Sequence, residues 1–162
     1  MKRVICLLLS CLILSGCSLT GDWVNEPVKF YYIRENYQND MQQVIASEVR
    51  EAAGHKQDLV YLLALYSMGP IQEGLMSPLP ANTVIIPTQR TESDITLIFS
   101  ESGQSMTDVD FTLSATCIAM TCMDLIELQQ VTVACGERTI TISEDNLLLD
   151  SSTIISPQEE IK

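Results

Sequence analysis

The sequence is poor in the side chains that most active sites require. Its single histidine, His55, lies in a polar segment between two predicted elements. A nucleophilic serine or cysteine needs a neighbouring base, most often histidine, and no Gly-x-Ser-x-Gly motif is present. The seven glycines are scattered, so no glycine-rich loop could cradle a phosphate. We therefore expect His55 to be a solvated loop residue, and we expect no enzymatic activity and no cofactor.

Basic residues are scarce as well. Nine lysines and arginines stand against 21 aspartates and glutamates, which gives a net charge of −12. Nucleic-acid binding depends largely on basic contacts to phosphate, so this composition argues against a nucleic-acid partner. An acidic surface also keeps a chain away from anionic lipid headgroups. The charge by itself is accounted for by solubility.

The carboxylates do not form a recognisable site. Asp108 and Asp110 lie at a predicted helix start, where the helix dipole stabilises negative charge. Glu144, Asp145 and Asp150 form an acidic cluster that could bind calcium weakly, but it lacks the glycine and ligand spacing of a calcium loop. We expect Asp108 and Asp110 to be capping residues, the acidic cluster to be a solvated edge, and no metal site.

The first residues contain an apolar run that is too short to cross a membrane. Lys2 and Arg3 precede Val4–Leu14, a run of about eleven residues, whereas a spanning helix needs about 20. The run ends in Leu14-Ser15-Gly16-Cys17, which resembles the lipobox of bacterial lipoproteins. The resemblance implies a signal peptide over residues 1–16, cleavage between Gly16 and Cys17, and acyl chains such as palmitate on Cys17. An ordinary secretory signal and a one-pass anchor are the alternatives.

Removal of the signal would change both the charge and the cysteine count. Loss of Lys2 and Arg3 leaves 7 basic against 21 acidic residues, a net charge of −14. Residues 17–27 would form a lipidated tether that holds the chain at the extracytoplasmic face of the bacterial cell membrane. Three unlipidated cysteines would remain, an odd number that excludes a closed disulfide framework. Their apolar surroundings predict buried thiols, with a single disulfide between the last two as the alternative: Cys117, Cys122 and Cys135.

The mature part has the size of one domain and alternates between β-rich and helical patterns. A nearly uniformly apolar helix is predicted over residues 59–68, with Asp58 as its N-cap and Gly69-Pro70 at its end. Because apolar residues occupy almost every side of it, we expect this helix to be buried against a sheet. A longer helix runs from Thr107 or Asp108 to about Ile126. Strands are predicted over residues 28–33, 83–88, 94–100, 131–135 and 138–143, the last two joined across Gly136-Glu137 as a hairpin.

Residues 41–51 are ambiguous from their pattern alone. Asp40 with Gln43 could open a helix as a capping box, and the apolar residues that follow recur at helical spacing. Val44–Arg50 could equally form a strand that pairs with the first one.

Several motifs together resemble the GerMN domain, a family named for sporulation and spore-germination proteins. The segments that carry the resemblance are Leu62–Pro70, Leu75–Thr83, Ile98–Glu101, Asp110–Ile118 and Val131–Val133 followed by Gly136. Asn82 stands where the family usually has glycine, and asparagine is the residue that best tolerates a positive φ in its place. The family has a strand ending in Glu-x-Arg at Val44–Arg50, so the resemblance predicts a strand there.

The resemblance covers residues 28–150 and leaves residues 151–162 as a polar tail. It implies an α+β fold: a single small domain with a mixed, mainly antiparallel sheet and two helices packed on one face. It also implies a protein-interaction or assembly module, in sporulation or spore germination, whose partners are other envelope proteins or further copies of itself. The alternative is a surface receptor that binds a small molecule or a cell-wall fragment.

Overall fold

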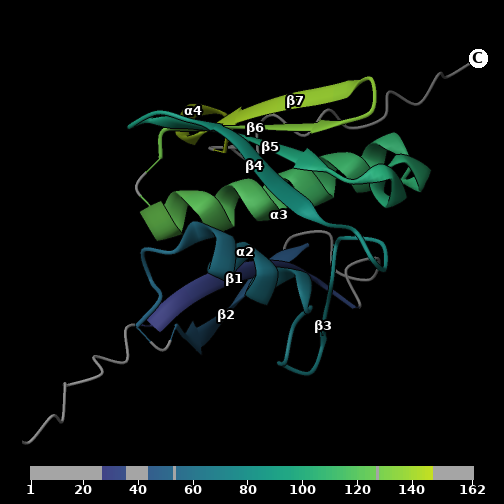
Figure 1. Ribbon diagram of the computed structural model, residues 1–162. Helices are drawn as coiled ribbons and strands as arrows, with labels where there is room; N and C mark the ends of the chain where they lie inside the picture. The colour runs from purple at the N-terminus through teal and green to yellow at the C-terminus, as the bar shows by residue number, and fades with distance from the viewer. Residues whose placement is uncertain (1–26, 36–43, 53, 127, 148–162) are drawn as a thin grey trace, which may run out of the picture.

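The computed structural model describes residues 27–35, 44–52, 54–126 and 128–147 (Figure 1). The predicted signal peptide, the cleavage position at Gly16 and Cys17, almost all of the tether and the polar tail lie outside these residues.

Within these ranges, seven strands form two separate sheets. The first has the order β2-β1-β3 and is antiparallel, with β1 (Pro27–Arg34) between β2 (Ile45–Glu51) and the short β3 (Leu75–Met76). The second has the order β4-β5-β6-β7. Its β5–β6 pair is parallel and its other pairs are antiparallel. Its strands are β4 (Ile85–Arg90), β5 (Asp94–Phe99), β6 (Gln130–Cys135) and β7 (Arg138–Ser143).

The long helix α3 (Asp108–Ile126) lies between the two sheets, with β4–β7 on one side and β1 on the other (Figure 1). It connects β5 to β6 as the crossover that a parallel pair requires. Its length and its mean hydropathy of 1.5 would suit a membrane span, but it serves here as a core helix and buries nine of its residues. A 3-10 helix η2 (Glu101–Ser105) precedes it, and α4 (Glu144–Leu147) follows β7.

Helix α2 (Leu59–Ser67) packs on the face of the first sheet that carries Phe30 and Tyr32. The ring of Tyr66 stacks on that of Tyr32 with 4.8 Å between centroids. The Tyr66 hydroxyl donates to the Tyr31 carbonyl at 3.0 Å, and the Tyr32 hydroxyl donates to the Tyr66 carbonyl at 3.1 Å. These reciprocal bonds fix the position of α2 on the sheet.

The α+β class and the mixed, mainly antiparallel strands are confirmed, and the strands divide into two sheets in place of the one expected. The reason is that α3 closes the edge of β1 that a further strand would need. The Thr121 hydroxyl accepts a hydrogen bond from the Tyr31 amide at 3.0 Å. A helix side chain thus takes the place of a strand neighbour, and strands β4–β7 assemble on the far side of α3.

Four local predictions about single segments and residues are confirmed. The strand over the ambiguous segment is confirmed as β2 from Ile45. Asp58 caps α2 by accepting from the Tyr61 amide at 3.1 Å. Thr107 is the cap of α3, since its hydroxyl accepts from the Asp110 amide. Asn82 has a φ of 65°, as the substitution for glycine predicted.

Candidate functional site

Helix α2 is buried against a sheet, as predicted, but only on one of its sides. Leu59, Leu62, Leu63 and Tyr66 are in the core. Val60 is 65% exposed and Met68, its C-terminal cap residue, is 81% exposed. Apolar residues occur all round α2, but the first sheet covers only one side of it. An apolar helix side left in solvent is typical of a surface that meets a partner.

Strand β2 lies beside this exposed side and has a free edge. Among the residues that the structure describes it pairs only with β1, and the Arg34 amide donates to the Val44 carbonyl at 2.9 Å. Because hydrogen-bonded pairs alternate along an antiparallel ladder, residues 46, 48 and 50 bond to β1. The amides and carbonyls of Ser47, Val49 and Glu51 therefore point outward, and among the described residues none of them has a backbone partner.

The free edge and the helix together border a hollow of 490 Å³, which we name the α2–β2 groove. Val49 is 62% exposed at this edge. The helix and the turn after it contribute four large apolar side chains, so most of the lining is apolar. The groove is lined by Val49, Arg50, Glu51, Tyr61, Leu65, Met68, Gly69 and Ile71.

A buried ion pair holds the groove in shape. Glu48 and Arg50 are 3% and 8% exposed and form a salt bridge. Arg50 also donates to the carbonyls of Leu65 and Gly69 at the end of α2, and its guanidinium lies 5.2 Å from the centre of the Phe30 ring. The Glu48 carboxylate accepts from the amides of the next turn, Ile71 at 3.0 Å and Gln72 at 2.8 Å. The pair thus ties β2 to both segments that line the groove.

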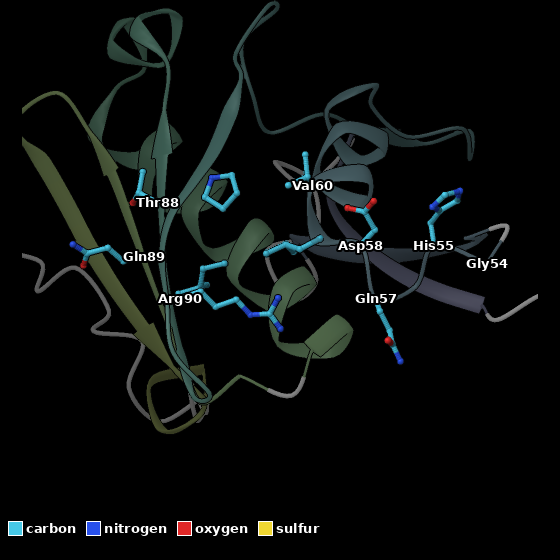
Figure 2. A pocket seen from close by; sticks show the side chains of 11 residues that line it. Gly54, His55, Gln57, Asp58, Val60, Thr88, Gln89 and Arg90 are labelled. Carbon is cyan, nitrogen blue, oxygen red and sulfur yellow. The ribbon is translucent and has the colours of Figure 1, made fainter.

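A second hollow, a cleft of 610 Å³, lies between α2 and β4. Figure 2 shows Arg90 of β4 and Val60 of α2 extending from opposite sides, with His55 at the far end. The Arg90 side chain has no hydrogen bond or ion pair with any residue that the structure describes. His55 is exposed and stacks on Tyr61 with 4.4 Å between ring centroids. It is therefore a surface loop residue, as expected, although it also lines this cleft.

The remaining candidate groups serve structural roles. Asp110 bonds to the Thr107 hydroxyl at 2.7 Å, and Asp108 lies 3.7 Å from Arg138. The described residues include no group of three His, Cys, Asp or Glu side chains that could hold a metal ion. Glu144 and Asp145 open α4, and Asp150 lies outside the described residues.

The three cysteines are buried and free, as predicted, and Cys122 forms no disulfide with Cys135. Burial raises the pKa of Cys117 and of Cys122 to about 12. A thiol with such a pKa is protonated at neutral pH and is a poor nucleophile.

The sequence motif indicated only that Glu48 and Arg50 lie at the end of a strand, and their role as a buried ion pair was missed. The available signal was their spacing, since residues two apart on a strand share one face. Two opposite charges on the face that must cover an apolar helix indicate a buried pair. No sequence pattern indicated that one side of α2 is exposed, because this exposure depends on how much of the helix the sheet can cover.

No protein-family model matches the chain, and no curated protein matches it. Among solved structures, the chain is similar to the first GerMN domain of the sporulation protein GerM from Bacillus subtilis, with 16% identity, 71% of this chain and 86% of that chain covered, and a TM-score of 0.49. The tandem GerMN domains of the same protein match with 15% identity, 71% and 40% coverage, and a TM-score of 0.49. A protein from Clostridium perfringens that is classed as a lipoprotein matches with 14% identity, 76% and 91% coverage, and a TM-score of 0.45.

Proposed function

We propose that this chain is a non-catalytic protein-interaction module of the bacterial envelope, anchored by a lipid on Cys17. The observation that carries the proposal is the α2–β2 groove, in which a free strand edge runs beside exposed apolar side chains. A free edge offers backbone hydrogen bonds, and apolar pockets beside it give specificity for an added strand. The expected partner presents an extended segment and, beside it, apolar side chains.

The anchor follows from the sequence around Cys17. A chain with a net charge of −14 after processing gains little from anionic headgroups, so acyl chains would supply the membrane affinity. The Leu14-Ser15-Gly16-Cys17 motif is the feature that supports lipid attachment. A role in sporulation or spore germination belongs to the proposal and rests on the GerMN motifs of the sequence.

Site-specific photo-cross-linking in intact cells tests the groove. A photoreactive residue replaces Val49 on the edge strand that borders the groove, and the same residue replaces Val109 as a matched control. Both are exposed valines, at 62% and 69%, and Val109 lies on α3, away from the groove. We expect discrete protein adducts from position 49 and none from position 109. Equal adducts from both positions, or none from position 49, would count against the groove as the binding surface.

A receptor function is the second candidate, and the cleft between α2 and β4 favours it. Its 610 Å³ falls within the range of small-molecule sites. Arg90 is the one arginine or lysine that lines it and has no partner among the described residues, so a ligand would carry a carboxylate or another anion. A thermal-shift screen of small carboxylates tests this function: a ligand that stabilises the wild-type chain and fails to stabilise Arg90→Ala would support it.

A further inference from the structure

We propose that the groove is occupied by a second copy of this chain, with β2 paired antiparallel to β2 about a twofold axis at Val49. This inference rests on the proposed function, since it names the partner of the same groove. It uses three properties of β2 and α2: the direction of the free backbone groups, the order of charges along the strand, and the position of the apolar side chains.

The backbone of β2 permits this pairing. Its outward groups belong to the odd-numbered residues Ser47, Val49 and Glu51. When Val49 faces Val49 of the second copy, Ser47 faces Glu51 of the second copy, and the reverse holds on the other side of the axis. Each facing pair joins two outward residues, so about six backbone hydrogen bonds can form across the interface.

The charges of β2 select this register over its neighbours. With Val49 on the axis, Glu48 of each copy lies opposite Arg50 of the other. A shift of two residues in one direction places Glu48 opposite Glu48, and a shift in the other direction places Arg50 opposite Arg50. Like charges directly opposite each other destabilise a strand pair. Glu48 and Arg50 are already paired within each copy, so the Val49 register is favoured over these two neighbours because it avoids like charges across the axis.

The apolar side chains of α2 then become covered. A twofold axis perpendicular to the sheet leaves both copies of α2 on the same face of one continuous sheet. That sheet contains the three strands of each copy. The groove side chains Tyr61, Leu65 and Met68 of one copy face those of the other, and the two Val49 side chains meet on the opposite face. The dimer thus explains why α2 is apolar on a side that its own sheet does not cover.

Charge substitutions at Val49 test the inference, because a residue on the axis faces itself. The full-length chain is solubilised in detergent and followed by sedimentation velocity. We expect a dimer for the wild type, loss of the dimer for Val49→Glu alone and for Val49→Lys alone, and recovery of a dimer when the two variants are mixed. Val109→Glu and Val109→Lys are the controls, and both should remain dimeric.

The outcomes separate this inference from the proposed function. A wild-type chain that is monomeric at all concentrations, with adducts to another protein from position 49 in cells, overturns the dimer and keeps the interaction module. A dimer that tolerates both Val49 substitutions overturns the β2 pairing. Absence of a dimer together with absence of adducts removes both.

Discussion

Arg50 shows how one residue can determine both stability and surface shape. It is a buried cation whose donors are used by Glu48, by the Tyr32 hydroxyl and by two carbonyls at the end of α2. A buried charge is tolerated only when such partners compensate for lost hydration. Removal of Arg50 would leave the Glu48 carboxylate buried, with only two amides to neutralise its charge.

Arg50→Ala should lower the free energy of unfolding by about 3–5 kcal/mol, because it breaks a buried pair and leaves one charge uncompensated. Urea denaturation followed by circular dichroism measures the change. Arg90→Ala is the control and should stay within about 0.5 kcal/mol, since Arg90 is exposed and has no partner among the described residues. A loss for Arg50→Ala that matches the control would show that the pair is not buried in solution.

The buried thiols make the fold sensitive to alkaline pH. Cys117 and Cys122 have a pKa of about 12 in the folded chain, against about 8.5 when unfolded. Above the unfolded pKa the unfolded state loses protons that the folded state keeps, so stability falls as pH rises from about 9 to about 12. Each thiol should lower the free energy of unfolding by about 1.4 kcal/mol for every pH unit in this window.

Thermal melts of Cys117→Ala with Cys122→Ala, compared with the wild type between pH 8 and pH 11, isolate this effect. The double variant should lose less stability than the wild type as the pH rises. Buried Tyr66 remains in both chains, and burial is the largest cause of its raised pKa. The charges of Cys117 and Cys122 raise that pKa further, so the double variant removes this smaller contribution together with the thiols. Parallel slopes for the two chains would contradict the assignment.

At the scale of elements, the relation between α3 and β1 determines the architecture. A strand edge is normally covered by another strand, but here the Thr121 hydroxyl accepts from the Tyr31 amide and donates to the Cys117 carbonyl at 2.8 Å. Lys29 and the Tyr31 hydroxyl both bond to Asp124 of the same helix, at 3.2 Å and 2.7 Å. The helix thus closes one edge of the first sheet and leaves β2 as the open one.

Thr121→Val keeps the shape of the side chain and removes its hydroxyl, so the Tyr31 amide loses its acceptor. An unsatisfied buried amide costs about 1–3 kcal/mol, and chemical denaturation should show a loss in that range. Thr116→Val is a matched control on the same helix, because its hydroxyl also donates to the carbonyl four residues earlier but is exposed. A difference of less than about 0.5 kcal/mol between the two variants would contradict the edge-closing role.

Sequence patterns predicted the elements better than their arrangement. The boundaries of α2, α3 and the β6–β7 hairpin follow from caps and turns, such as Asp58 and Gly136, whose effects are local. The division into two sheets depends on one hydroxyl of α3 reaching the backbone of β1, about 90 residues apart in the chain, and no local pattern encodes that contact. The groove has the same origin. Its residues come from β2, α2 and the turn after α2, and its exposure is a property of the assembled domain.

At the scale of the whole molecule, the proposed lipid anchor on Cys17 is open to a direct test. Cys17→Ala should abolish the incorporation of labelled palmitate and block lipoprotein processing. The reason is that the resemblance to a lipobox makes the Cys17 thiol the group to which the lipid is attached. Cys11→Ala, in the apolar run of the same segment, is the control and should still be labelled. Palmitate that still enters the Cys17→Ala chain would refute the anchor.

The pairing of β1 with β2 bears on the direction from which a partner can approach. Pro27, the first residue of β1, lies opposite Glu51, which lines the groove. Nine residues lie between Cys17 and Pro27, where the sheet begins, and the chain from Cys17 to Pro27 reaches at most about 35 Å when extended. A lipid at Cys17 would thus keep the groove within a thin layer above the bilayer. Encounters between anchored copies would be confined to two dimensions, which raises their effective concentration. A modest intrinsic affinity would then be enough for neighbours in the same leaflet to associate. A protein that diffuses through the medium would need a far higher affinity for the groove.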